Sequence, residues 1–190
     1  MPQLDWPDAW SVTSRRARIR PVRISDVGRL GEILSDQRVV RTWRDPTGVV
    51  QGEDLWTYLY SFGNLSMAVE IPGRSECVGL VQIYGMDTRC GTASLACFTE
   101  PKVWRLGVAA EAIACLSNLM FDEFGLRKLY LECPASVFKT FASAEGHLFY
   151  REGKFRDRWL RDGDVEDIFV LAIWSHMRDI HGWWSVSTAG

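Results

Sequence analysis

Three strand-like runs joined by short turns, between residues 66 and 99, limit the possible folds of this chain more than any other feature. Turn residues lie at Pro72-Gly73 and between Asp87 and Gly91. Connections this short favour antiparallel hairpins, because a parallel pair needs a longer crossover. The three runs are SMAVEI (Ser66–Ile71), ECVGLVQIYGM (Glu76–Met86) and TASLACFT (Thr92–Thr99).

The segment after the third run changes to helical spacing. Apolar residues recur from Val108 to Phe124 at helical intervals, and Gly125 stands where a helix is expected to stop. The run RKLYLEC (Arg127–Cys133) has the pattern of a strand, and Pro134 ends it. A strand, a helix and a strand in this order predict a right-handed crossover onto a parallel neighbour.

The remaining chain supplies further strands and helices. Ala17–Val22 alternates as a strand should, and Ser25-Asp26 can cap the helix that follows it. Alternation on both sides of Asp162-Gly163-Asp164 predicts a long hairpin. Other helices are expected near Glu53–Phe62 and over Ala135–Glu145. The order of elements predicts a single-domain α/β fold, an α+β mixed sheet with helices over its faces.

The length of the chain and its ends set the expected domain boundaries. A chain of 190 residues suits one well-buried core. Residues 1–16 lack periodicity and are expected to form an N-terminal arm that packs through Trp6 and Trp10. The domain is expected to cover residues 17–175, followed by a C-terminal tail over residues 176–190.

Composition narrows the class of partner. Hydrophobic residues make up 47% of the chain and charged residues 24%, as in a water-soluble globular protein. A net charge of −2 gives no general attraction to nucleic acid or to an anionic membrane, so a nucleic-acid partner is disfavoured. No window is apolar enough to span a bilayer, and the N-terminus lacks the pattern of a targeting signal.

Cysteine and histidine usage points to a reducing compartment and away from a metal site. The chain has five cysteines, an odd number, and none lies in a Cys-x-x-Cys pair. A reduced, cytoplasmic protein is the simplest interpretation. None of the three histidines is spaced with Cys, Asp or Glu as metal ligands usually are, so no bound metal is expected.

The stretch TEPKVWRLGVAAEA (Thr99–Ala112) is a candidate phosphate site. A helix that starts near Gly107 leaves its first N–H groups without intrahelical partners, at the positive end of the helix dipole. Gly107 allows close approach of a ligand to the backbone, and Arg105 could add a bidentate contact. The alternative is that small residues at Ala109 and Ala110 only allow the helix to pack on the sheet.

This stretch and the closing hairpin together resemble a known family. TASLACFTEPKVWRLGVAAEA (Thr92–Ala112) is similar to the strand, loop and helix of the GNAT N-acyltransferase superfamily, in the branch of the RimJ/RimL ribosomal-protein N-terminal acetyltransferases. REGKFRDRWLRDGDVEDIFVLAI (Arg151–Ile173) resembles the last hairpin of that branch. The order of elements agrees as well, so the resemblance covers roughly residues 18–174.

The resemblance implies a fold with splayed central strands and a thioester donor between them. It implies that Phe98 and Thr99 meet pantetheine, and that an amine attacks acetyl-CoA or another acyl-CoA directly. The acceptor would be a primary amine of a small molecule or of a protein N-terminus. The loop implied to hold the pyrophosphate comprises Arg105, Leu106, Gly107, Val108 and Ala109.

Departures from the family pattern leave the catalytic acid unassigned. Arg105-Leu106 removes one glycine from the expected loop, and PASVFKTFASAEG lacks the Asn and the Tyr that many members carry. The hydroxyl groups nearest the expected place are those of Ser136 and Ser143, each of which could instead be a cap or a surface residue. The carboxylate of Glu100 could accept the amine proton through water, or could be an ordinary loop residue.

The acceptor residues and the donor stay open at this stage. In the family, the region of Trp43 and Trp56 shapes the acceptor site, and Tyr84 ends a strand near its expected mouth; core packing is the alternative for all three. An acyl carrier protein could supply the acyl group in place of CoA. A GNAT-like module that binds ligands without turnover is a further alternative, and an oligomer is compatible with the sequence.

Overall fold

One mixed sheet organises the chain. The computed structural model describes residues 10–43, 52–59, 65–161, 163–178 and 187–188. The strands in this part of the chain are β1 (Val12–Thr13), β2 (Arg18–Pro21), β3 (Leu65–Glu70), β4 (Cys77–Asp87), β5 (Thr92–Thr99), β6 (Lys128–Pro134), β7 (Tyr150–Arg161), β8 (Asp164–Trp174) and β9 (Ser187–Thr188). Their order across the sheet is β7-β8-β6-β5-β4-β3-β2-β1-β9.

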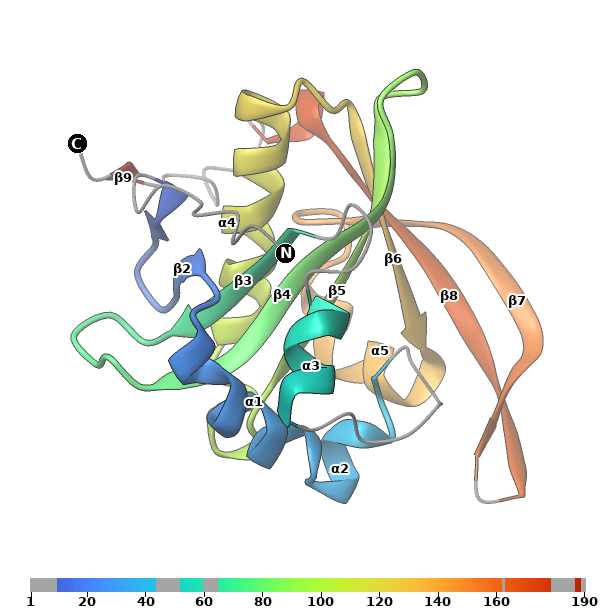
Figure 1. Cartoon of the computed structure of the whole chain (residues 1–190). Helices are drawn as coiled ribbons and strands as arrows, with labels where there is room; N and C mark the ends of the chain where they lie inside the picture. The colour runs from blue at the N-terminus through green and yellow to red at the C-terminus, as the bar shows by residue number, and fades with distance from the viewer. Residues whose placement is uncertain (1–9, 44–51, 60–64, 162, 179–186, 189–190) are drawn as a thin grey trace.

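The described helices lie over both faces of the sheet. They are α1 (Val27–Leu34), α2 (Gln37–Val40), α3 (Gly52–Leu59), α4 (Val108–Glu123) and α5 (Ala135–Phe141), with short 3-10 turns η2 (Ile24–Asp26), η3 (Pro101–Val103), η4 (Ala142–Ala144) and η5 (Ser175–Met177). In Figure 1, α1 and α3 lie in front of the strands and α4 lies behind them. Two hydrophobic clusters follow from this arrangement, one under α4 and α5 and one under α1–α3.

The predicted meander is confirmed. Strand β4 pairs antiparallel with β3 on one side and with β5 on the other. The crossover through α4 then places β6 parallel to β5, as the order of strand, helix and strand predicted. Helix α4 ends where Gly125 takes a left-handed φ of 62°, and the amide of Leu126 donates to the carbonyl of Met120 at 3.3 Å. The predicted helix stop is therefore correct.

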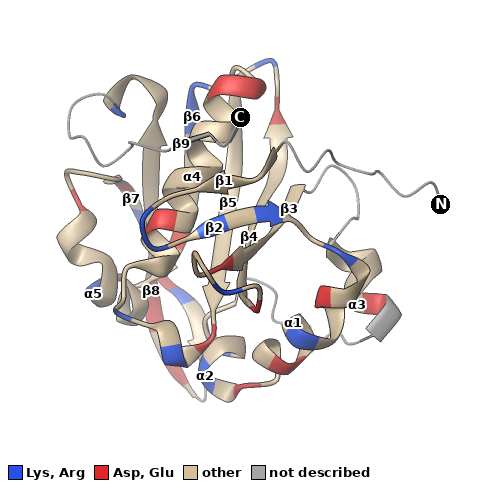
Figure 2. Ribbon diagram, turned by 90° about the vertical axis from the view of Figure 1, so that its left-hand side faces the viewer, with Lys and Arg blue, Asp and Glu red and all other residues tan. Residues whose placement is uncertain are grey.

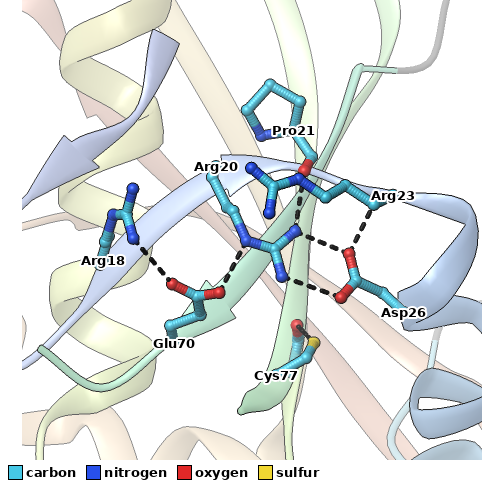
Figure 3. A network of polar contacts seen from close by, with 8 residues as sticks. Arg18, Arg20, Pro21, Arg23, Asp26, Glu70 and Cys77 are labelled. Atoms are coloured by element: carbon cyan, nitrogen blue, oxygen red, sulfur yellow. Dashed lines mark hydrogen bonds and ion pairs between the residues drawn. The ribbon is translucent and has the colours of Figure 1, made fainter. Parts of the chain in front are cut away.

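The start of α1 differs from the prediction. Asp26 is the residue before the helix, but its side chain makes no capping hydrogen bond to α1. It accepts instead from the backbone N–H of Arg23 at 2.7 Å and from two nitrogens of Arg20. Figure 3 shows this buried carboxylate, together with Glu70, on either side of the Arg20 guanidinium. Charge pairing with β2 therefore fixes the start of α1.

The ends of the chain extend the sheet beyond residues 17–175. Strand β1 pairs antiparallel with β2, and β9 pairs with β1. Trp10 packs edge-on against Phe124 of α4, with ring centroids 5.7 Å apart. The other arm residue expected to pack, Trp6, lies outside the described residues, as does the end of the second predicted helix at Phe62.

The helix and the hairpin predicted for the last third of the chain are confirmed, with shifted boundaries. The predicted helix over Ala135–Glu145 ends earlier, because α5 gives way to η4 after Phe141. Strands β7 and β8 form the predicted long hairpin, which projects from the body of the molecule in Figure 1. Figure 2 shows both signs of charge spread over helices, strands and loops alike. Among the described helices, none has the length and apolar character needed to cross a membrane.

Candidate active site

A gap between β5 and β6 is the centre of the site. The two strands pair in parallel over four residues, from Thr92 with Lys128 to Leu95 with Leu131. Beyond this point β6 continues to pair with β8 on its other side, as far as Pro134. Within the described sheet, residues 96–99 of β5 therefore have no strand partner on the side of β6.

The register of β4 and β5 tells which backbone groups face this gap. The amide of Glu100 donates to the carbonyl of Val78 at 2.8 Å, so Glu100 directs its backbone groups toward β4. Alternate residues of a strand direct them to opposite sides, which places those of Phe98 toward β4 and those of Cys97 and Thr99 toward the gap. The carbonyl of Thr99 accepts a hydrogen bond from Trp104 Nε1 at 2.9 Å.

Free amides lie at the start of α4, beside the end of β5. Gly107 precedes the helix in a left-handed conformation with φ of 80°. In the described chain, the amides of residues 107–110 donate to no protein acceptor, and helix formation leaves them at the positive end of the dipole. The free amides do not extend over the whole loop before the helix, because the amide of Trp104 donates to Pro101 and that of Leu106 donates to Val103, at 3.3 Å each.

Arg105 adopts a conformation that normally favours glycine. Its φ is 65°, and the cost of a left-handed backbone is roughly 1–2 kcal/mol for a residue with a side chain. The family pattern has one more glycine in this loop, at the place that Arg105-Leu106 occupies in this chain. The loop therefore keeps a left-handed turn before Gly107 without that glycine, at the cost of some backbone strain.

Arg16, from the turn between β1 and β2, reaches the same helix start. A Cβ added to Gly107 would stand 2.7 Å from Arg16 Nη1, so the guanidinium lies directly over this glycine. Glu111 in the first turn of α4 accepts from the backbone N–H of Arg16 at 2.6 Å and from Ser14 Oγ at 2.7 Å. Glu111 thus fastens the turn and its cation to α4.

A cavity of about 580 Å³ joins these features. It is bounded by the free end of β5 at residues 97–99, by Arg16 and by the loop and first turn of α4 at residues 103–111. Side chains of α2 and the turn after it, and of α5 and η4, complete the lining. A volume of this size is typical of small-molecule and cofactor sites. The free amides and two cations at one end suit a phosphate group.

Residues 16–136 match the sequence model of the acetyltransferase (GNAT) domain. This chain belongs to the GNAT family. The match covers the sheet from before β2 to the first residues of α5, and so includes the gap and the loop before α4. The predicted GNAT superfamily and the single-domain GNAT fold with parted central strands are confirmed, whereas the RimJ/RimL branch stays a prediction.

Solved GNAT structures share the fold at low identity. Spermidine N-acetyltransferase from Vibrio cholerae, in complex with CoA and spermine, superposes with a TM-score of 0.75 at 17% identity, over 87% of this chain and 99% of that one. A GNAT-family acetyltransferase from Bacillus anthracis gives 0.70 at 20%, over 87% and 99%. A GNAT-family protein from Chromobacterium violaceum gives 0.71 at 20%, over 94% and 96%. No curated protein sequence matches the chain.

The residues predicted to meet the donor line one continuous surface. The cavity lining includes Phe98, Thr99 and the whole loop from Arg105 to Ala109. Because the backbone groups of Phe98 point toward β4, its contribution to the cavity is its side chain. Cys97 offers free backbone groups instead, a role that the sequence pattern alone does not indicate.

The two predicted hydroxyl residues, Ser136 and Ser143, also line the cavity, and they differ in their hydrogen bonding and exposure. Ser136 donates from Oγ to Glu166 Oε1 at 3.2 Å, and its amide donates to Glu166 Oε2 at 3.0 Å. Ser136 is therefore not the cap of α5; Pro134 precedes the helix and Glu166 of β8 receives its amide. Ser143 in η4 is exposed at the cavity.

Glu100 lies on the side of β5 that faces α1. Its carboxylate accepts from Arg29 Nη2 at 2.6 Å, and only 12% of the side chain is exposed. Arg29 also pairs with Glu32 at 3.1 Å and with Glu76 at 3.3 Å. Glu100 is not among the residues that line the cavity.

The three predicted acceptor residues lie on the α1–α3 face, away from the cavity wall. Trp43 is 5% exposed and packs edge-on against Phe98, with ring centroids 4.8 Å apart. Trp43 thus supports a cavity residue from behind. Trp56 and Tyr84 are partly buried against the same hydrophobic cluster. None of the three lines the cavity.

Cys97 is a protonated thiol at neutral pH. Burial raises the pKa of its side chain to about 12, so the thiolate that would act as a nucleophile is scarce. No group of His, Cys, Asp or Glu in the described residues is arranged to hold a metal ion. The polar features of the cavity are backbone amides, arginine side chains, hydroxyl groups and the carboxylate of Glu111, which lies 3.6 Å from Arg16 Nε.

Proposed function

We propose that this protein transfers an acyl group from an acyl-CoA thioester to a primary amine. The observation that carries the proposal is the gap between β5 and β6, which opens into a cavity that ends at the free amides of residues 107–110. A pantetheine arm is long and carries amide groups, and a diphosphate is anionic. The gap offers free backbone groups to the pantetheine arm, and the start of α4 offers N–H donors to the diphosphate.

Two arginines strengthen the anion site in this proposal. Arg16 lies over Gly107, and Arg105 is in the loop that precedes it. A guanidinium binds a phosphate through paired, charge-assisted hydrogen bonds, each stronger than a neutral one. Arg16 is 91 residues away from Gly107 in the sequence, so the loop motif alone does not include it.

The reaction needs no covalent enzyme intermediate. The lone pair of the amine attacks the thioester carbonyl carbon, a C–N bond forms and the C–S bond breaks. The electron pair of that bond stays on sulfur as the thiolate, which takes up a proton to become the CoA thiol, while the amine nitrogen releases a proton to solvent. Holding the two reactants in line can contribute about 7–11 kcal/mol to lowering the barrier.

The acceptor is proposed only as a class. The RimJ/RimL resemblance supports a protein N-terminus, whereas the structural neighbour from Vibrio cholerae, a spermidine acetyltransferase, supports a small-molecule amine. That neighbour is 17% identical to this chain, and we propose no choice between the two kinds of acceptor. A cytoplasmic location belongs to the same proposal, supported by five cysteines that are all free thiols.

Calorimetric titration tests the donor first. Acetyl-CoA, longer acyl-CoAs and free CoA are titrated into the protein, and thiol release is then followed with a panel of primary amines. Binding of a CoA species with release above the uncatalysed rate supports the proposal. Absence of binding by every CoA species overturns it, and tight binding without release on any amine favours a module without turnover.

The exposed apolar residues at the cavity mouth support a second donor. Trp104 is 40% exposed and Leu106 is 56% exposed, and Arg105 lies between them. An apolar patch beside a cation suits the acidic, amphipathic surface of an acyl carrier protein that delivers the same phosphopantetheine arm. Side-by-side assays with acyl-CoA and acyl carrier protein at equal concentration separate the two donors.

A further inference from the structure

The sheet face on which α1–α3 lie continues beyond those helices. The helices pack over Leu80, Ala96 and Phe98 of β4 and β5. On β6, residues alternate between faces, and Leu129 and Cys133 belong to the cluster under α4 and α5. Leu131 packs against the same cluster, so the alternate residues Tyr130 and Glu132 point to the α1–α3 face.

Three tyrosines cross this face in one row. The register pairs Tyr84 with Ser94, Ser94 with Tyr130, Tyr130 with Ala172, and Ala172 with Tyr150. Neighbouring strands are ~4.8 Å apart, so successive tyrosines of the row stand about 10 Å apart, with a small residue between each two. All three tyrosines are half-buried.

Glu132 lies two residues after Tyr130 on the same face of β6. It immediately follows Leu131, the last residue that pairs with β5, and so stands at the edge of the gap. Its side chain is exposed, and within the described residues its carboxylate has no ion pair or hydrogen bond. The backbone of Glu132 is held between flanking residues of β6 that pair with β8.

The other charges on this part of the face neutralise each other. Lys128 Nζ is bonded to the carboxylate of Glu152. The same ammonium group lies 4.6 Å from the ring centroid of Tyr130 and 5.0 Å from that of Trp174. Within the described part of the chain, Glu132 is therefore a carboxylate beside the gap without a cationic partner, and its sign favours a cation.

We infer that Glu132, with the rings of Tyr84 and Tyr130, binds the ammonium group and the adjoining carbon chain of the acceptor. This inference rests on the proposed function, because the gap is where an amine has to meet a thioester. A carboxylate next to aromatic rings recognises an organic cation by ion pairing and by contact with the ring faces. A carboxylate on the acceptor would meet Glu132 with like charge, so the substrate class is an amine without one.

Tyramine and tyrosine form a matched pair of probes, because they differ only in the carboxylate. Their dissociation constants are measured by calorimetry with the wild-type protein and with Glu132→Gln. We expect wild-type protein to bind tyramine at least ~10-fold more tightly than tyrosine, and Glu132→Gln to lose ~10-fold in tyramine affinity, as for a lost charged hydrogen bond. Tyrosine amide, which lacks the negative charge, is expected to bind as tyramine does.

Controls separate this inference from the proposed function and from a folding defect. Glu123→Gln, at an exposed residue at the far end of α4, is expected to leave tyramine affinity unchanged. CoA affinity and the unfolding temperature are expected to be the same in all three proteins. Equal tyramine affinity of wild type and Glu132→Gln, or no tyramine binding by wild type, overturns the inference, whereas the proposed function is overturned by the CoA titration.

Discussion

Arg20 and Asp26 form a bidentate ion pair in the interior of the protein, with hydrogen bonds of 2.7 and 2.8 Å. The exposed fractions of the two side chains are only 5% and 8%. Arg20 Nε also donates to Glu70 at 2.6 Å, so one guanidinium joins β2, β3 and the start of α1 (Figure 3). Helix α2, which follows α1, contributes residues to the cavity lining, and this pair anchors the start of α1.

Replacing Asp26 is expected to destabilise the fold. In Asp26→Asn, Arg20 loses the charge that compensates it, and breaking a buried pair costs about 3–5 kcal/mol. Asp36→Asn is the matched control, because Asp36 makes a bidentate pair with Arg38 at the surface. The free energy of unfolding in urea measures both, and a loss for Asp26→Asn no larger than for the control contradicts the prediction.

The pair of Arg20 and Asp26 makes the free energy of unfolding depend on pH. Burial by itself raises the pKa of Asp26, but hydrogen bonds from the side chain of Arg20 and the backbone of Arg23 outweigh it and hold the pKa below the usual 3.8. The unfolded chain therefore takes up the proton at a higher pH than the folded chain does. The contribution is complete above pH ~4 and is lost as pH falls through the lower, folded pKa.

Urea unfolding between pH 7 and pH 3 tests this dependence. The difference in the free energy of unfolding between wild type and Asp26→Asn is expected to be constant above pH ~4 and to shrink below it. Asp36→Asn reports what loss of a surface pair does over the same range. A difference that grows toward low pH has the wrong sign for this mechanism.

Local patterns sufficed to predict the meander and α4, because each depends on residues close in sequence, whereas the gap was expected only from the family resemblance. Short turns define the hairpins, and the left-handed Gly125 ends α4. The role of Asp26 could not be predicted in this way. Its position before a helix suggested a cap, whereas its partner Arg20 is also bound by Glu70, a contact that forms only after β2 pairs with β3. Asp26 keeps a local role, since it accepts from the backbone N–H of Arg23 as in a capping box of η2, and adds a tertiary charge pair that no local pattern predicts.

The candidate site shows the same division. The loop from Arg105 to Ala109 could be found by its glycine and its small residues, which produce an open helix start wherever they occur. Arg16 could not, since it reaches Gly107 through a turn that Glu111 fastens to α4. Glu100 precedes a proline at the end of a strand, which gives no sign that Arg29 binds it.

Gly107→Ala is expected to weaken CoA binding by roughly ten-fold. The added Cβ would stand 2.7 Å from Arg16 Nη1 and displace a guanidinium whose charged hydrogen bond is worth about 1.5–3 kcal/mol. Gly125→Ala is the matched control, because its φ of 62° carries the same backbone strain with no atom within 4 Å. Both variants are expected to lose roughly 1–2 kcal/mol of stability. Equal CoA affinity of the two variants, measured by calorimetry, contradicts a role for Arg16.

Glu100→Gln is expected to keep most of the acyl-transfer activity. The carboxylate is mostly buried and bound to Arg29 on the α1 side of β5, so its loss is expected to lower stability by about 1–3 kcal/mol and to change turnover by no more than about two-fold. Arg29→Met and the double variant complete a cycle in which the two stability losses are not additive. Removal of a general base slows turnover by about a hundred-fold or more. A loss of that size in Glu100→Gln would show that Glu100 is the general base.

Cys97→Ala is expected to leave turnover within about two-fold of wild type, because a direct attack of the amine needs no acyl-cysteine. The raised pKa of Cys97, about 12, leaves on the order of one thiolate in 10⁴ molecules at pH 8. Iodoacetamide at that pH is expected to label the exposed Cys90 and to spare Cys97, as peptide mass spectrometry would show. Cys90→Ala removes the expected label and serves as the control. An acyl adduct on Cys97 after incubation with acyl-CoA alone would establish the covalent route instead.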